Sequence, residues 1–126
     1  MTPLGAKLRQ LRRARGVTLS QMADALNVSA AYISALEHGR RGRPTFAFVQ
    51  RIIGYFNIIW DEAEELQRLA AMSDPRVTLD TAGLSPKATQ FANRIARDIH
   101  RLDEAALDEL DAVLDRRGER KPRKPR

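Results

Sequence analysis

Short stretches of helical apolar spacing, each preceded by a residue that can cap a helix, constrain the fold of this chain most. Leu4, Leu8 and Leu11 recur at the three- and four-residue spacing of one helical face. Thr2 can serve as an N-cap, and Pro3 fits the first helical position, where its missing N–H costs nothing. No stretch of the sequence alternates apolar and polar residues convincingly, as a strand would. The first helix is therefore expected to begin at Pro3.

A second and a third helix are expected next, joined by a tight turn. Thr18 and Gln21 have the S/T-x-x-E/Q spacing of a capping box, which would open the second helix. Asn27 tolerates the left-handed conformation that a tight turn requires. Ser29 can cap the third helix, which should stop at Gly39. The residues expected to face inward are Met22, Ala23, Leu26, Ile33 and Leu36.

A fourth and a fifth helix complete the predicted N-terminal domain over residues 1–72. The fourth is expected to begin at Pro44 and to bury Phe48, Val49, Ile52, Ile53 and Phe56. The fifth should run from about Trp60 to Met72, with an inward face made of Trp60, Ala63, Leu66, Leu69 and Ala70. Acidic residues crowd the first turns of this helix, where the helix dipole favours negative charge, and this explains them better than a metal site does.

The C-terminal part of the chain is expected to hold a linker over 73–86, a helical segment over 87–115 and a disordered basic tail over 116–126. The tail is too polar and proline-rich to fold by itself. Ser85 and Pro86 again form an N-cap followed by a first-turn proline. An apolar stripe with an eleven-residue period then follows, made of Phe91, Ile95, Ile99, Leu102, Ala106, Leu110 and Val113. One long helix and a break near Asp103, which can cap a new helix, are both compatible with this stripe.

Composition limits the class of protein. A chain of 126 residues is long enough for one compact domain and an appendage. The chain has no cysteine, which excludes disulfides, thiolate metal sites and cysteine nucleophiles. No apolar run approaches the roughly 18 residues that a membrane span needs, and the N-terminus lacks the apolar region of a signal peptide. We therefore expect a cytoplasmic protein without a membrane partner.

Positive charge gathers at the two ends of the chain. Residues 1–44 hold eight Lys or Arg against two acidic residues, and residues 116–126 hold seven against one. Residues 45–115 hold seven Lys or Arg against thirteen acidic residues. Basic ends around an acidic middle indicate a polyanionic partner, of which nucleic acid is the commonest. A merely solvated charged surface is the alternative.

Two short helices joined through Leu26, Asn27 and Val28 form a helix-turn-helix pattern, in which the second helix fits the major groove of B-DNA. Over residues 4–58 the sequence resembles the Xre family of bacterial and phage repressor-like helix-turn-helix domains. The residues that carry the resemblance are Leu11, Arg12, Thr18, Met22, Ala23, Tyr32, Ile33, Ser34, Leu36, Glu37, Gly39 and Pro44. The resemblance implies an all-α, five-helix domain that binds double-stranded DNA as a dimer, followed by a C-terminal helical extension of one or two helices. It also implies a nucleoid-associated location.

The resemblance further implies a set of DNA-contacting residues. The third helix would present Ser29, Ala30, Ala31, Tyr32, Ser34 and Ala35 to the groove. The contacts expected at the start of the second helix are Thr18, Ser20 and Gln21. Family members often carry a glutamine directly after the capping threonine, but Leu19 stands there in this chain, so that polar contact is absent. Glu37 is expected to be structural, and His38 to be a surface residue near phosphate.

Arginines should supply much of the affinity for DNA. Arg40, Arg41 and Arg43 are expected to clamp the phosphate backbone beside the third helix. Arg12, Arg13 and Arg15 form either a second basic patch or a solvated face. The basic tail either follows the minor groove or confers solubility.

The third helix itself is poor in base-reading side chains. Arg for guanine and Asn or Gln for adenine make the strong bidentate contacts, and none of them occurs between Ser29 and Leu36. Two hypotheses follow. Specificity comes from DNA shape and half-site spacing, or an arginine of the following loop reaches into a groove.

The leading prediction is a sequence-specific, homodimeric transcriptional repressor. Its dimerisation residues would be Phe91, Ile95, Ile99, Leu102 and Leu110. The alternatives are an antitoxin-like protein whose residues 87–115 bind a partner protein, and a non-specific packaging protein; a sensory role for the C-terminal part also stays open. We expect no enzyme, catalytic residue, metal or cofactor, because His38 and His100 lie in separate segments and no nucleophile–base or phosphate-loop motif is present.

Overall fold

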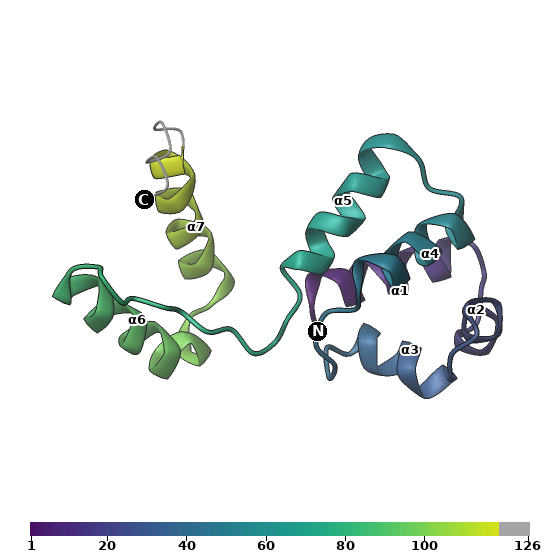
Figure 1. Cartoon of the computed structure of the whole chain (residues 1–126), viewed down its shortest axis with the longest axis horizontal. Helices are drawn as coiled ribbons and strands as arrows, with labels where there is room; N and C mark the ends of the chain where they lie inside the picture. Colours follow the sequence, from purple (N-terminus) through teal and green to yellow (C-terminus); the bar gives the residue numbers. More distant parts are fainter. Residues whose placement is uncertain (119–126) are drawn as a thin grey trace. The chain divides into compact units, whose positions relative to one another are not determined.

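The computed structural model describes residues 1–118, which form seven α-helices and one short 3-10 helix and contain no strand. The chain divides into two compact units, Met1–Thr78 and Leu79–Arg126. The first unit holds five helices, and further helices follow it in the second (Figure 1). The predicted all-α class, a five-helix domain with a C-terminal helical extension, is therefore confirmed. No helix within residues 1–118 is long and apolar enough to span a bilayer.

The first unit contains α1 (Pro3–Ala14), α2 (Leu19–Leu26), α3 (Ala30–Glu37), α4 (Phe46–Phe56) and α5 (Trp60–Ala71). Helix α1 packs against α3 and α5, while α4 packs against α2 and α5 (Figure 1). Helices α2 and α3 contact each other. One core lies between the five helices, and its completely buried members are Leu8, Met22, Ile33, Val49, Ile52 and Leu66.

Local capping explains where the first three helices begin and confirms the predictions made for them. The Thr2 hydroxyl accepts a hydrogen bond from the N–H of Gly5 at 3.0 Å. Both bonds of the capping box between Thr18 and Gln21 are present. Asn27 ends α2 in the left-handed conformation with φ 58°, and Ser29 caps α3. Each cap satisfies backbone groups that the ends of a helix leave without a partner.

The start of α4 differs from the prediction. The helix begins at Phe46, two residues after Pro44, and Pro44 is a buried residue of the preceding loop. Thr45 is the N-cap, and its hydroxyl accepts a hydrogen bond from the N–H of Phe48 at 3.1 Å. The helix starts after Thr45 and not at Pro44, because the threonine side-chain oxygen can satisfy a free N–H of the first turn.

The inward position predicted for Trp60 is wrong. Its side chain is 81% exposed, whereas Leu66 and Ala70 of the same helix are buried. Trp60 has φ 54°, a left-handed conformation that is rare for a bulky residue. This conformation turns the indole away from the face that regular helical spacing assigns to it. Ile58, which is buried, joins the core instead.

The second unit contains α6 (Pro86–Asp98), the 3-10 helix η1 (Ile99–Arg101) and α7 (Glu104–Gly118). Ser85 caps α6, as predicted. The chain breaks after η1, because Leu102 is extended and the Asp103 carboxylate accepts a hydrogen bond from the N–H of Ala106 at 2.8 Å. The apolar stripe thus runs over α6, η1 and α7, with Leu102 in the break between η1 and α7. Residues 116–118, predicted as part of the tail, belong to α7, and residues 119–126 lie outside the described residues.

A buried ion pair ties the end of α3 to α1. Glu37 is 1% exposed, and the Arg12 guanidinium donates two hydrogen bonds to its carboxylate, from Nε at 2.8 Å and from Nη2 at 3.1 Å. Arg12 Nη1 also donates to the Val17 carbonyl at 3.2 Å, and Arg9 Nε lies 3.5 Å from Glu37 Oε1. The hydrogen bond with Glu37 raises the pKa of Arg12 above its ordinary value. Arg12 is therefore structural, and its expected place in a surface patch or a solvated face is wrong.

Gly5 lets α1 approach the same end of α3. A Cβ atom at this position would lie 2.5 Å from the carbonyl oxygen of Glu37 and 2.6 Å from that of Leu36. Both neighbours are backbone atoms, so a side chain could fit only if the helices moved apart.

Replacing Gly5 with alanine is expected to lower the free energy of unfolding by about 2 kcal/mol, because it overpacks the contact between α1 and α3. Gly54, which lies inside α4 with open space around its Cβ position, is the matched control. Gly54→Ala should raise the unfolding free energy by about 0.4–1 kcal/mol. Urea unfolding of both variants measures the difference. Equal stability of Gly5→Ala and the wild type would contradict the close approach.

Replacing Arg12 with methionine should cost about 3 kcal/mol of stability, since it leaves the buried Glu37 carboxylate without its bidentate partner. The double variant Arg12→Met/Glu37→Met should regain most of this loss, because it removes the buried charge as well. Arg13→Met, at the exposed neighbouring position, should stay within about 0.5 kcal/mol of the wild type. Unfolding in guanidinium chloride measures these differences. Equal stability of Arg12→Met and Arg13→Met would refute a stabilising role for the Arg12–Glu37 pair.

Candidate nucleic-acid interface

Helix α3 is held on the core by its inner residues. Ile33 and Leu36 are buried in the core, and Ala23 of α2 is buried with them. A small residue at Ala23 allows α2 and α3 to cross closely. The outer surface of α3 therefore has a fixed orientation with respect to α2.

The six residues of α3 and its cap that the resemblance assigns to DNA do not share one environment. Ser29 and Ala31 are exposed, while Ser34 and Ala35 are partly exposed. Ala30 and Tyr32 are also only partly exposed, and both pack against the core. The Ser29 hydroxyl accepts a hydrogen bond from the N–H of Tyr32 at 3.1 Å, so it retains its own hydrogen for donation. The most accessible part of α3 consists of small side chains.

The three residues predicted at the start of α2 are all exposed. Thr18 and Gln21 form two hydrogen bonds with each other. The Gln21 side-chain oxygen accepts one from the N–H of Thr18 at 2.8 Å, and the Thr18 hydroxyl accepts the other from the N–H of Gln21 at 3.0 Å. Ser20 takes no part in this capping box. Leu19 is partly buried against the core, so it acts as a packing residue.

Arg40, Arg41 and Arg43, which we name the arginine loop, lie between α3 and α4 and are exposed. The loop starts directly at the end of α3. Gly39 has φ 70°, and the N–H of Arg40 donates to the Ala35 carbonyl at 2.9 Å. This left-handed glycine and its hydrogen bond close the helix. The structure thus brings the arginine loop to the C-terminal end of α3.

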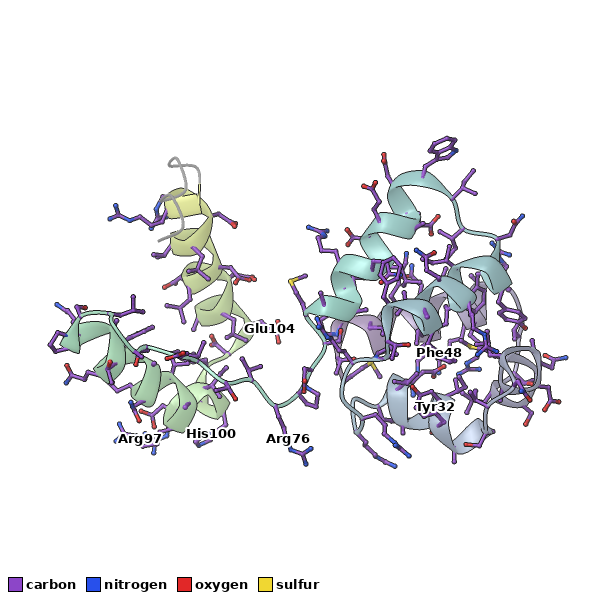
Figure 2. The ribbon with its side chains drawn as sticks, in the orientation of Figure 1. Tyr32, Phe48, Arg76, Arg97, His100 and Glu104 are labelled. Atoms are coloured by element: carbon purple, nitrogen blue, oxygen red, sulfur yellow. The ribbon has the colours of Figure 1, made fainter. Side chains whose placement is uncertain are left out.

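Cations and aromatic rings alternate along one side of the first unit. The Arg41 guanidinium lies over the Tyr32 ring, 5.6 Å from its centroid. The Tyr32 and Phe48 rings meet edge to face, with centroids 5.5 Å apart (Figure 2). The Arg51 guanidinium lies over Phe48 at 5.7 Å and donates a hydrogen bond to the Leu26 carbonyl at the end of α2. This series connects α2, α3, α4 and the arginine loop.

His38 links α3 to α1 at the protein surface. Its Nδ1 lies 2.8 Å from the Ser34 carbonyl oxygen, and its Nε2 lies 3.3 Å from Nη2 of Arg9. The tautomer that donates from Nδ1 leaves Nε2 to accept from arginine. The ring is exposed, as the sequence predicts.

No role was assigned from the sequence to Arg51 or to Ile59, which is exposed beside Trp60. Arg51 is the one charged residue of α4, and it is exposed, so the sequence gives no signal of its contact with Phe48. Ile59 occupies the N-cap of α5 without a capping hydrogen bond from its side chain. An apolar residue at an N-cap departs from the usual preference for Ser, Thr, Asp or Asn.

Several relatives match part of this chain. RghRB of Bacillus subtilis (strain 168), an uncharacterized HTH-type transcriptional regulator, is 38% identical over 61 residues, which are 48% of this chain and 44% of that protein. The HTH-type transcriptional repressor RghR of the same organism is 42% identical over 52 residues, or 41% of this chain and 38% of that protein. The matched stretch is therefore less than half of each of these relatives.

A solved structure of a complex of the SinR and SinI proteins contains a chain that is 23% identical to this one. The match covers 78% of this protein and 96% of the solved chain, with a TM-score of 0.41. The family model described as a helix-turn-helix domain matches residues 3–66, half of the 126-residue chain. The resemblance to helix-turn-helix regulators is thereby confirmed, and this protein belongs to the helix-turn-helix domain family.

Proposed function

We propose that this protein is a sequence-specific transcriptional regulator that binds double-stranded DNA, acting as a homodimeric repressor with α3 in the major groove. The observation that carries the proposal is the slim outer surface of α3, held on a rigid core and followed directly by the arginine loop. The names of RghRB and RghR, a transcriptional regulator and a transcriptional repressor, support the same function.

The shape of α3 suits the major groove. An α-helix with its side chains is about 10–12 Å wide, and the groove is about 12 Å wide. Ala31 and Ala35 add little width to the outer surface of α3 and can contact thymine methyl groups. Ser29 and Ser34 can form hydrogen bonds with base edges or phosphates. Thr18, Ser20 and Gln21 at the start of α2 would then face the adjacent backbone.

The arginine loop supplies charge at the edge of this surface. Arg40, Arg41 and Arg43 are exposed and would neutralise phosphates beside α3. Each neutralised phosphate steepens the dependence of log K on log salt by about 0.9. Phosphate contacts position a protein on DNA without reading its sequence. Affinity and positioning in this proposal therefore come mainly from the loop, whereas α3 makes the contacts with base edges.

The second unit favours self-association. None of residues 79–118 is buried, although this stretch carries an apolar stripe. Phe91 is 54% exposed and Ile99 52%. Helix α6 and η1 carry mainly basic residues, Lys87, Arg94, Arg97, His100 and Arg101, while the first twelve residues of α7 carry Glu104, Asp108, Glu109, Asp111 and Asp115. Opposite charges on α6 and α7 fit a second copy of this chain, in which α6 of one copy meets α7 of the other.

A dimer also fits the spacing of paired half-sites on DNA. Paired half-sites one helical turn apart require two recognition helices about 34 Å apart. We assign Phe91, Ile95, Ile99, Leu102 and Leu110 to the dimer interface. The domain limits that go with this proposal are 1–72 for DNA binding, 73–86 for the linker and 87–115 for dimerisation.

A second candidate function rests on the same exposed stripe. An antitoxin-like protein would use α6 and α7 to cover a partner protein and not a second copy. Because no residue within 79–118 is buried, the stripe could be covered either by a second copy of this chain or by a partner protein. The charge difference between α6 and α7 favours a second copy, because each helix then finds its opposite in an identical chain.

Footprinting on the DNA upstream of the protein's own gene should show two inverted, protected half-sites whose centres lie one helical turn, or a multiple of it, apart. Arg40→Ala should weaken binding to all sequences alike and reduce the salt slope by about 0.9. Arg68→Ala is the control, since Arg68 is an exposed arginine of α5, a helix that packs on α1 and α4. Uniform protection without half-sites would favour the packaging alternative.

Replacing Ile95 with aspartate should convert the dimer to a monomer, as measured by size-exclusion chromatography with light scattering. Each buried isoleucine contributes about 1.5–3 kcal/mol, and a dimer loses two, so the dissociation constant should rise at least about a hundredfold. Asn93→Asp adds the same charge on the polar side of α6 and should leave the dimer intact. A wild-type monomer that forms an equimolar complex with a partner protein would favour the antitoxin-like function.

A further inference from the structure

Helix α3 lacks the side chains that read bases most selectively. Bidentate hydrogen bonds from Arg to guanine, or from Asn or Gln to adenine, give the strongest discrimination in the major groove. None of these residues occurs from Ser29 to Leu36. Bidentate base reading by this protein would therefore have to come from a side chain outside α3.

Arg41 reaches the surface of α3 from outside the helix. It lies four residues beyond Glu37, the last residue of α3, but its guanidinium lies over the ring of Tyr32, near the start of that helix. The loop thus folds back and brings a long cationic side chain alongside α3. The separation of 5.6 Å from the ring centroid is within the range of a cation–π interaction.

The ring beneath Arg41 is held in place. Tyr32 is partly buried, and its ring meets Phe48 edge to face at 5.5 Å, with an angle of 77° between the ring planes (Figure 2). Phe48 belongs to the core and carries Arg51 over its own ring at 5.7 Å. Arg51 is anchored in turn to the Leu26 carbonyl. Three interactions in series therefore hold the Tyr32 ring beneath Arg41. They join Tyr32 to Phe48, Phe48 to Arg51, and Arg51 to the Leu26 carbonyl.

Stacking leaves the hydrogen-bonding edge of a guanidinium available. A guanidinium that lies over an aromatic ring can interact through its flat face, and its N–H groups along the edge then stay free to donate hydrogen bonds. That edge matches the two acceptors of guanine, O6 and N7. Holding the side chain in advance also lowers the entropy lost when it meets DNA.

We propose that Arg41, positioned by Tyr32, reads a guanine in the major groove beside α3, whereas Arg40 and Arg43 contact phosphates alone. Tyr32 is a positioning residue in this scheme, since it acts through Arg41. The proposal rests on the proposed function, DNA binding by α3, and it identifies which arginine of the loop carries sequence information.

The test is selection of a randomised duplex library by the full chain, followed by competition between duplexes that differ at one base pair. The wild type should prefer G·C at one position of each half-site. Arg41→Lys keeps the charge but loses the planar fork, so this single preference should fall by about 5- to 150-fold, the range of a bidentate contact. Arg40→Lys should leave every base preference unchanged.

Two substitutions of Tyr32 separate positioning from packing. Tyr32→Phe keeps the aromatic face and should retain the wild-type preference. Tyr32→Leu keeps an apolar side chain but removes that face, so the same G·C preference should fall while circular dichroism shows an unchanged fold. Arg41→Lys alters only an exposed loop residue, so it decides the question even if Tyr32→Leu unfolds the domain.

Outcomes distinguish this proposal from the function on which it rests. A wild type that selects no sequence overturns both. A wild type that selects half-sites, with preferences that Arg41→Lys leaves unchanged, overturns the role of Arg41 and leaves the regulator intact. Loss of the same preference in Arg40→Lys would equally overturn it, since the preference would then not depend on Arg41 in particular.

Discussion

The carboxylate of Glu37 lies inside the first unit, and its pairing with Arg12 is the interaction on which the candidate interface depends. A buried carboxylate is tolerated only where charged donors surround it, and Arg12 supplies two hydrogen bonds while Arg9 lies close by. Glu37 is the last residue of α3, so the ion pair fixes that end of the helix against α1. Gly5 admits the close contact at the same point. The start of the arginine loop is therefore determined by α1, a helix to which we assign no DNA contact.

Local signals were enough to predict most of the first unit. Helix starts at Thr18 and Ser29 depend on bonds between residues three apart, which a sequence displays directly. The buried residues of α2 and α3 follow from helical spacing in the same way. The errors arise where a neighbouring element or an unusual backbone decides the outcome. Arg12 looks like any surface arginine until Glu37 is placed beside it, and the left-handed conformation of Trp60 removes its side chain from the predicted inward face.

The second unit shows a different limit of sequence patterns. The apolar stripe from Phe91 to Val113 continues through Asp103, so spacing alone does not distinguish one helix from two. Asp103 decides the matter because its carboxylate caps Ala106, and a capped start competes with continuation of the preceding helix. The stripe is then divided between α6 and α7, and none of residues 79–118 is buried. Exposed apolar stripes on oppositely charged helices are what an association surface requires.

Leu19 and Tyr32 together explain why we propose that a loop arginine reads a base in this domain. Leu19 packs against the core at the position where related domains often place a glutamine, so the start of α2 offers less polar readout. Helix α3 does not compensate, because its accessible residues are small. The Tyr32 ring packs edge to face against Phe48, and the Arg41 guanidinium lies over it. A cation fixed on an aromatic ring loses little freedom on binding, so one preorganised arginine can provide discrimination that several flexible ones could not. In the proposed scheme, the small side chains of α3 and the base contact from Arg41 are then two consequences of the same sequence.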